Sequence, residues 1–478
     1  MKLIKNIIYN TGYQVLSLIF PLITIPYVSR IFGIDGMGSA AYTNTVVSYF
    51  SLFAALSSVL YGNREVAYNQ DNKENRSIVF WEIFFIKAIT TTISVISFLF
   101  LVIFVIKEDY VLYFMQSFIL LAVGLDISWY FMGVEEFKNI ILRNMLIKIL
   151  AVIVTFTFVK SPNDLWIYVG TVPISTFLGN LSMWPFMKNE VNLVRFKDLN
   201  LKRHIKPMLQ LFLPQILIQF YLYLNKLMLG NMDSKAAAGI FDQSDRFIRV
   251  AVTLVTSLSA AVIPRIAYLH STHQEEEISN IMYRSFRMVN AISIFSMFSI
   301  MAVSESFAVY FLGSEFKEVG IVMFIQSIMI VFVAWANVLG NQYLLPTNMI
   351  KEFNIGAFIG LIVNVVMNLI LIPKLGVVGA TITTVLTEVA VTLYQMFVLR
   401  KRFNIATFLF ETWKYLLAGI LVFFVTNWID RSTPSSMFFY IIEACVAVVT
   451  YIVALKLLRS TILDELFALV KGVVKKNE

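Results

Sequence analysis

The chain has 478 residues, of which 58% are hydrophobic and only 14% are charged, and its mean hydropathy is +0.76. Soluble domains carry about 25% charged residues. The composition therefore excludes a soluble globular protein and indicates a polytopic membrane protein. One cysteine, Cys445, excludes a disulfide framework within the chain and argues against a cysteine-based metal site. The formal net charge of +8 raises nucleic acid as a partner, but the distribution of the charges argues against it.

Fourteen apolar segments of roughly 20 residues are each long enough to cross a bilayer. They are continuously apolar, which predicts helices rather than the alternating strands of a barrel. The first follows Lys2 and Lys5 but is too long for a signal peptide, so we expect it to be retained. The predicted spans are 9–29, 39–61, 79–105, 110–132, 140–159, 164–187, 208–230, 237–264, 288–311, 320–342, 354–373, 377–399, 412–429 and 437–457.

Basic residues lie mainly on one side of the predicted membrane. Of the 38 lysines and arginines, seven fall in outer loops and five within spans, which leaves 26 in inner segments. The positive-inside rule therefore predicts that both termini are cytoplasmic. This topology accounts for the basic charge and makes nucleic acid an unlikely partner. The outer loops are short, so we expect the function to lie among the helices.

Two stretches repeat at an offset of about 200 residues, which is typical of duplicated transporters. The segment after Ala40 aligns with the one after Ala237, and Arg64 then falls near Arg265. "YVGTVPISTFLGN" likewise resembles "VVGATITTVLTEV". We predict two pseudo-symmetric six-helix bundles and a final helix pair. The predicted divisions are 1–188 (N-terminal half), 189–207 (basic cytoplasmic linker), 208–403 (C-terminal half) and 404–478 (helix pair and tail). The linker has two interpretations, a topology signal or a segment on anionic lipid.

Several motifs occur together in order: "IPYVSRIFGIDGMG", "YGNREVAYN", "LFLPQILIQFYLYLNKLMLG", "VIPRIAY" and "NLILIPKLGVVGATITTVLTE". With them the chain resembles the bacterial polysaccharide flippases of the Wzx type, which belong to the multidrug/oligosaccharidyl-lipid/polysaccharide exporter superfamily. The resemblance implies alternating-access transport of an undecaprenyl-diphosphate-linked oligosaccharide from the cytoplasmic to the outer leaflet of the bacterial inner membrane. The implied partners are the lipid-linked substrate, the bilayer and other polysaccharide assembly proteins. Where such flippases often have Asp-Lys, this chain has Asn225-Lys226, which puts carboxylate-based ion coupling at that position in doubt.

The predicted eighth span contains "FDQSDRFIR", which places Asp242, Asp245, Arg246 and Arg249 among apolar residues. At 100° per residue these four side chains lie within an arc of about 100°. Arg249 lies roughly 18 Å below the outer end, near the middle of a core about 30 Å thick. An arginine facing lipid at that depth costs at least about 2.5 kcal/mol. The charged stripe must therefore face the protein interior or a water-filled cavity.

This stripe has two compatible interpretations. In the structural one, Asp242–Arg246 and Asp245–Arg249 neutralise each other at i,i+4 spacing and fix the helix. In the functional one, the arginines bind the substrate diphosphate, for which planar guanidinium groups are suited, and the aspartates hold them in place.

Further charged residues are weaker candidates. Lys226 occupies a family motif position and joins the diphosphate candidates, as do Arg30 and Arg64, although topology anchoring is the simpler role for those two arginines. Glu388 lies near mid-span and is the candidate coupling carboxylate. Lys87 lies near an inner boundary, where snorkelling is the favoured interpretation.

The sequence has no P-loop, which argues against ATP hydrolysis by this chain. His204, His270 and His273 fall in inner loops, and we expect no metal and no cofactor. The predicted protein is a carrier rather than an enzyme. The alternatives are a cation-coupled multidrug antiporter of the same fold and, from another class, a membrane polymerase or glycosyltransferase.

Overall fold

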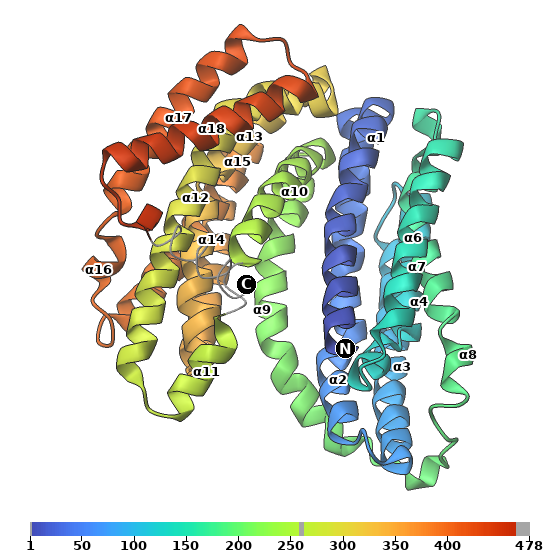
Figure 1. Cartoon of the computed structure of the whole chain (residues 1–478). Coiled ribbons are helices and arrows are strands. Elements are labelled where there is room, and N and C mark those ends of the chain that lie inside the picture. Colours follow the sequence, from blue (N-terminus) through green and yellow to red (C-terminus); the bar gives the residue numbers. More distant parts are fainter. Residues whose placement is uncertain (1, 258–261, 465–478) are drawn as a thin grey trace. The chain divides into compact units, whose positions relative to one another are not determined.

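The computed structural model describes residues 2–257 and 262–464, and within these ranges the regular structure is helical, with no strand. The helices form two compact units, unit 1 (Met1–Gly239) and unit 2 (Ile240–Glu478) (Figure 1). The all-α polytopic class predicted from the sequence is confirmed.

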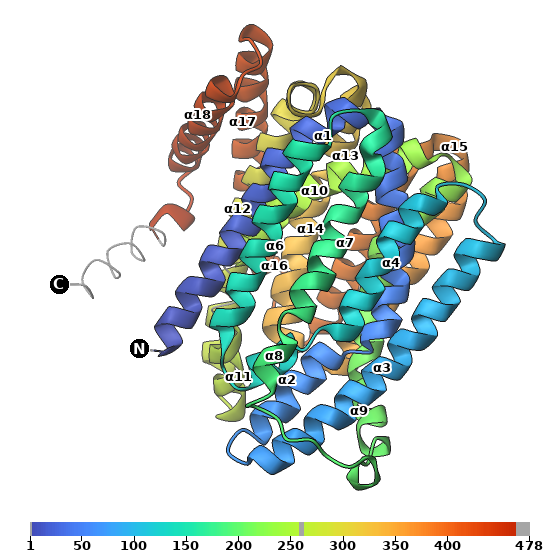
Figure 2. The same ribbon diagram turned by 90° about the vertical axis from the view of Figure 1, so that its right-hand side faces the viewer.

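Unit 1 is built around α1, with α4, α6 and α7 running side by side next to it (Figure 2). Asn72 illustrates how local sequence sets an element, because its side chain accepts hydrogen bonds from two backbone amides at the start of α3. The elements are α1 (Lys2–Ala55), α2 (Ser58–Tyr68), α3 (Lys73–Phe104), α4 (Tyr110–Leu125), α5 (Ser128–Gly133), α6 (Phe137–Phe158), η1 (Pro162–Asp164), α7 (Leu165–Leu181), α8 (Trp184–Met187), η2 (Phe196–Asp198) and α9 (Lys202–Met232).

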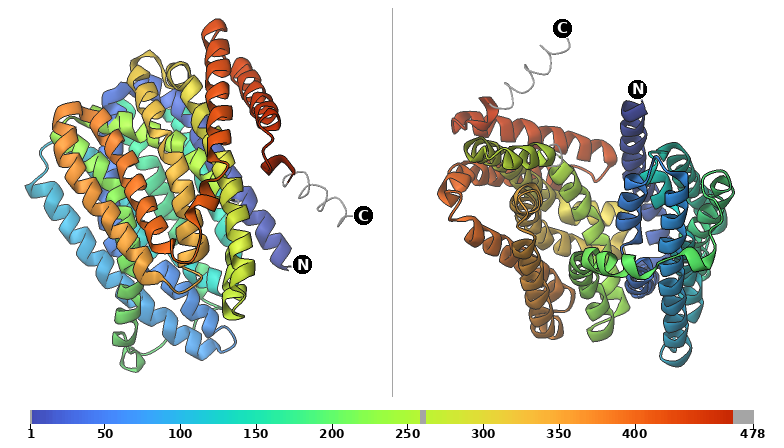
Figure 3. Two further views of the ribbon diagram at one scale, coloured as in Figure 1. Left: turned by 90° about the vertical axis from the view of Figure 1, so that its left-hand side faces the viewer. Right: turned by 90° about the horizontal axis from the view of Figure 1, so that it is seen from below.

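Most of α10 belongs to unit 2, whereas its first residues, up to Gly239, belong to unit 1. Two late helices, α17 and α18, pack together, and α17 lies along α12 (Figure 3). The elements are α10 (Lys235–Ser257), α11 (Ile263–Ser271), α12 (Glu275–Leu312), η3 (Ser314–Phe316), α13 (Lys317–Gln326), α14 (Met329–Ala336), the π-helix η4 (Asn337–Leu344), α15 (Ile350–Leu399), α16 (Ile405–Leu409), α17 (Thr412–Ser432) and α18 (Met437–Leu457).

The predicted spans fall on these helices, although residues 258–261 of the eighth span lie outside the described residues. Within the described ranges, eight helices are long and apolar enough to cross a membrane, or up to ten if two bent pairs each count as one span. The predicted number of fourteen therefore stays a prediction. One reason for the lower number is that α1 and α15 each cover two predicted spans.

Two glycines create the corners inside α1 and α15. Gly33 has φ 61° and Gly376 has φ 53°, a region that side chains with a Cβ rarely adopt. Three residues after Gly376 comes Gly379, where an added Cβ would lie 2.3 Å from the Leu371 carbonyl oxygen. The "FGIDG" and "KLGVVG" motifs therefore mark sharp reversals between consecutive predicted spans.

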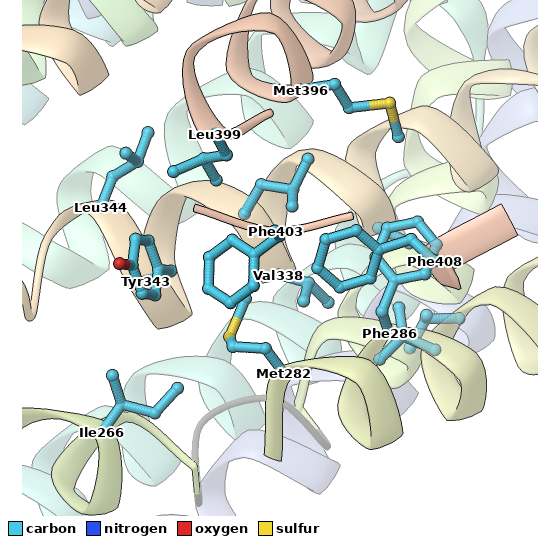
Figure 4. Packing of buried hydrophobic residues seen from close by; sticks show 14 of the residues in the cluster. Ile266, Met282, Phe286, Val338, Tyr343, Leu344, Met396, Leu399, Phe403 and Phe408 are labelled. Atoms are coloured by element: carbon cyan, nitrogen blue, oxygen red, sulfur yellow. The ribbon is translucent and has the colours of Figure 1, made fainter. Parts of the chain in front are cut away.

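Each unit has its own aromatic-rich core. In unit 1, Phe80 stacks on Trp129 with ring centroids 5.4 Å apart. In unit 2, Phe408 packs against Phe286 at 4.7 Å and against Phe403 at 5.6 Å, and Tyr343 meets Phe403 edge-on (Figure 4).

The division between the units falls at Gly239, so the predicted linker 189–207 and all of α9 lie in unit 1. The sequence repeat places its boundary earlier, at the linker. The two divisions describe different properties, compactness and duplication, and the predicted halves remain a proposal.

Candidate functional site: the charged face of α10

The charged stripe of α10 forms two parallel ion pairs in unit 2. Nε of Arg246 lies 2.7 Å from Oδ2 of Asp242, and Nε of Arg249 lies 2.7 Å from Oδ2 of Asp245. The two aspartate side chains are only 7% and 5% exposed, whereas the arginines are 41% and 40% exposed. Buried carboxylates therefore hold two half-exposed guanidinium groups one helical turn apart.

A glutamine on α13 supports the second pair. The Gln326 side-chain amide donates to Oδ1 of Asp245 at 3.2 Å, and its carbonyl oxygen accepts from the Ser244 hydroxyl at 2.5 Å. Gln326 is fully buried. Because Asp245 is bonded through both carboxylate oxygens, its position and that of Arg249 are fixed from two helices. An amide inside an apolar span is the one feature of the sequence that marks Gln326 as unusual.

The structure also brings Glu388 to this cluster. Glu388 lies on the second half of α15, is almost completely buried, and is within electrostatic range of Arg249 and Asp245. Residues from α10, α13 and α15 thus converge, and two independently predicted features, the stripe and the mid-span glutamate, belong to one site.

Two of the other three candidate cations, Lys226 and Arg64, lie at different levels of unit 1. Contacts between α9 and the second half of α1 give the heights of these residues along unit 1. Tyr42 bonds Asn231 near one end of the contact, and Ser57, just after α1, bonds Gln215 near the other end. Lys226 lies near the first end. Arg64 lies beyond the second, one turn after Tyr61, which bonds His204 of α9.

From His204 to Lys226, α9 runs about 33 Å along its axis, at 1.5 Å for each of 22 residues, and the 45° bend between Phe220 and Leu222 shortens the direct distance only slightly. One diphosphate therefore cannot contact both Lys226 and Arg64. Arg64 pairs with Glu65 at 3.2 Å and covers the Tyr61 ring at 5.3 Å, while Arg30 donates to the Pro26 carbonyl oxygen at 2.7 Å. These local contacts agree with anchoring roles for both arginines.

Lys87 does not snorkel. It is fully buried, and its ammonium group donates to the Asp126 carbonyl oxygen at 2.6 Å, where α4 ends. The sequence favoured snorkelling because Lys87 lies only several residues from the inner boundary of its predicted span. The break between α4 and α5 instead supplies a buried acceptor.

Sequence reasoning missed a buried polar network in unit 1. His204, expected in an inner loop, is only 2% exposed and donates through Nε2 to Glu82 at 2.7 Å. With that proton placed, Nδ1 accepts from the Tyr61 hydroxyl, also at 2.7 Å. Glu82 further accepts from Nε of Arg203 at 2.9 Å and from the Asn200 amide. The network ties the start of α9 to α2 and α3.

Within residues 2–257 and 262–464, no group of three or more His, Cys, Asp or Glu side chains lies close enough to hold a metal ion. His270 instead lies 3.6 Å from Glu275, and Cys445 is an isolated exposed thiol.

Ionisable side chains gathered inside an apolar helical unit define a multi-pass membrane protein with the features of a transporter. Residues 3–270, more than half of the chain, match the family described as "Polysaccharide biosynthesis protein", and the chain belongs to this family. It is 24% identical over 398 residues to the "Putative O-antigen transporter" of Shigella dysenteriae, covering 82% of this chain and 98% of that protein. The corresponding protein of Escherichia coli is 23% identical over 406 residues, covering 83% and 97%.

Solved structures share the fold at low sequence identity. The structure described as "Lipid II flippase MurJ, inward closed conformation" aligns with a TM-score of 0.77 at 15% identity, covering 95% of this chain and 98% of that chain. An inward-facing multidrug resistance transporter of the MATE family aligns at 0.61 and 13% identity, covering 80% and 95%. The resemblance inferred from the sequence motifs is thereby confirmed.

Proposed function

We propose that this protein is a flippase that moves undecaprenyl-diphosphate-linked oligosaccharide repeat units from the cytoplasmic to the outer leaflet of the bacterial inner membrane. It acts as a carrier, with both termini cytoplasmic, and supplies a polysaccharide export pathway. Family membership and two relatives named as O-antigen transporters support the substrate class.

The observation that carries the proposal is the pair of half-exposed arginines on α10. A diphosphate needs charged donors that remain charged at every physiological pH, and guanidinium supplies them in a planar fork. Buried Asp242 and Asp245 set the direction of Arg246 and Arg249 before the substrate arrives. Such preorganisation reduces the entropy lost when the complex forms.

Glu388 provides a route for coupling to protons. The cluster holds two arginines and three carboxylates, so its net charge is −1 when Glu388 is ionised and 0 when Glu388 is protonated. A proton on Glu388 therefore favours binding of an anionic diphosphate next to Arg249. We propose that proton and substrate bind to the same state of an alternating-access cycle.

The test is the leaflet occupied by complete lipid-linked repeat units in cells depleted of the protein. The proposal expects them to accumulate on the cytoplasmic side and to be released by wild-type protein, but not by the Arg246→Ala/Arg249→Ala variant at equal abundance. Normal export in depleted cells rejects the flippase function. Normal rescue by the variant rejects only the arginine site.

A cation-coupled multidrug antiporter is the second candidate, favoured by the MATE-family fold and by the buried carboxylate Glu388. The half-exposed arginines disfavour it, since they repel cationic drugs. Expression of the protein in a drug-sensitive strain decides this point, because an antiporter raises resistance to cationic dyes and a flippase leaves it unchanged.

A further inference from the structure

The segment between α8 and α9 is held in place by hydrogen bonds to unit 1. The Asn192 amide donates to the Ser77 hydroxyl at 2.9 Å, and the Trp81 indole donates back to the Asn192 carbonyl oxygen at 3.0 Å. Nearby, Lys73 donates to the Asn189 carbonyl oxygen at 2.8 Å. Contacts on both sides of Asn192 make this segment a fixed part of unit 1 rather than a loose tether.

Despite these anchors, the segment presents large apolar side chains outward. Leu193 is 91% exposed and Phe196, at the start of η2, is 67% exposed. Such side chains are unfavourable in water, and here they alternate with exposed cations. The exposed basic residues of the surrounding stretch are Lys188, Arg195, Lys197, Lys202, Arg203 and Lys206, of which Arg195 pairs with Asp198 at 3.0 Å and Arg203 pairs with Glu82.

The length of α3 gives the depth of this surface. With 32 residues α3 is about 48 Å long, about 18 Å more than the hydrocarbon core. Exposed apolar side chains continue to its outer end at Phe104. Counting back about 20 residues, or about 30 Å, puts the inner boundary of the core near Phe85. The Phe196 ring lies 5.5 Å from the Phe85 ring, so Phe196 is at that boundary.

An aromatic cluster marks the same level independently. Trp81 and Phe84 lie 5.9 Å apart, and Phe84 meets Trp184 at 4.9 Å. Aromatic side chains of this kind gather where the headgroups meet the hydrocarbon. The length of α3 and the position of the aromatic cluster therefore place the segment at the same depth, the inner boundary of the hydrocarbon core.

We infer that residues 188–202 form a binding surface for anionic phospholipid of the inner leaflet. Leu193 and Phe196 enter the boundary between headgroups and acyl chains, and the exposed lysines and Arg195 bind the phosphate groups. Each basic residue near an anionic surface strengthens binding about fivefold. The surface fixes the depth of α9 in the membrane, because α9 begins at Lys202, the last residue of the surface.

The experiment places a polarity-sensitive fluorescent probe on this surface in the full chain. In a Cys445→Ser background, Leu193→Cys carries the probe, and Gln274→Cys, exposed in the turn before α12, carries the control probe. The protein is reconstituted into phosphatidylcholine vesicles with or without phosphatidylglycerol, both containing a lipid-attached quencher. We expect the probe at 193, but not at 274, to be quenched, and more strongly with phosphatidylglycerol.

Charge-matched variants separate headgroup binding from simple apolar contact. Lys197→Gln/Lys202→Gln should reduce the phosphatidylglycerol-dependent quenching at least about fivefold. Lys351→Gln/Lys401→Gln, which removes two exposed inner cations of unit 2, should leave it unchanged. Equal exposure of both probes to water, as when the surface faces a soluble partner, overturns the inference. Quenching that is indifferent to phosphatidylglycerol and to the variants also overturns it. Neither readout depends on transport.

Discussion

Two groups of buried carboxylates, one in each unit, use the same chemistry to opposite effect. Around Glu82 in unit 1, Arg203, His204 and a backbone amide all converge on one carboxylate. On α10 in unit 2, Asp242 and Asp245 each hold one arginine whose side chain stays about 40% exposed. Exposure of the cation does not separate the two groups, because the Arg203 side chain is itself 48% exposed. The difference is that the Glu82 network ties α9 to α2 and α3, whereas α10 presents two exposed guanidinium groups one helical turn apart, where both can contact one diphosphate. The comparison separates a structural network from a candidate binding site.

The largest expected effect is on transport, from loss of the α10 arginines. Arg246→Ala/Arg249→Ala removes two charged contacts of about 1.5–3 kcal/mol each, so we expect transport of lipid-linked repeat units to fall at least about 100-fold. The measurement is initial export rate per protein in inverted membrane vesicles. Arg246→Lys/Arg249→Lys retains charge without the planar fork and should keep part of the rate. Equal rates for the wild type and the alanine variant would sink the assignment.

Glu82→Gln should instead affect stability. It replaces the buried carboxylate that accepts from half-exposed Arg203 and from His204, and loss of hydrogen bonds to a charged group costs about 1.5–3 kcal/mol. We expect a large fall in melting temperature of the detergent-solubilised protein, with normal transport from the protein that folds. Glu65→Gln, which removes the partner of half-exposed Arg64, is the control and should cost at most about 1 kcal/mol. A Glu82 variant with unchanged melting temperature but no transport would reverse the comparison.

Glu388→Gln tests the coupling proposal. The amide imitates the protonated carboxyl, so diphosphate binding should become independent of pH and remain at the level that the wild type reaches in acid. The check is titration of binding against pH, where we expect acid to strengthen diphosphate binding by the wild type and to leave binding by the variant level. Parallel pH profiles for the two proteins would remove Glu388 from the mechanism.

A smaller effect is expected at Gln326. Replacing it with Leu removes one hydrogen bond to Asp245, worth about 1 kcal/mol, and loosens Arg249 without touching the substrate. Transport should fall about fivefold through weaker substrate binding, with maximal rate preserved. Gln342→Leu is the matched control, because Gln342 is also buried in unit 2 but bonds Ser285 instead. If both variants behave alike, Gln326 has only a packing role.

The smallest effect concerns Asp164, a carboxylate in η1 at the outer boundary of the sixth predicted span. Backbone amides of Lys160 and Ser161 donate to Asp164 at 2.9 and 2.8 Å and lower the pKa of its carboxyl below the usual 3.8. A lowered pKa contributes stability above pH 3.8 that is lost as pH falls through the folded-state value. Wild-type protein should therefore lose slightly more melting temperature than Asp164→Asn on acidification below about pH 4. An identical loss in both proteins would contradict this role.

The sequence predicted the contacts between side chains on the same helix, because these contacts depend only on residue spacing. Asp242 with Arg246 and Asp245 with Arg249 form the pairs expected at i,i+4, and the mid-span position of Glu388 marked it as unusual. The corners at Gly33 and Gly376 were visible only as motifs, since their backbone angles depend on how the flanking helices pack.

Long-range pairing lay beyond sequence reasoning. Glu82 and His204 are 122 residues apart, and no local pattern predicts their contact. Gln326 meets Asp245 because α13 packs near α10, and Lys87 is covered because α4 breaks at Asp126. In each case a polar side chain found its partner in tertiary structure.

The most direct test of the central claim is binding of undecaprenyl diphosphate to purified protein, measured by native mass spectrometry against undecaprenyl monophosphate. The account predicts that the wild type prefers the diphosphate at least about tenfold and that Arg246→Ala/Arg249→Ala loses this preference. Equal preference in both proteins would mean that the charged face of α10 holds helices together and that the diphosphate binds elsewhere.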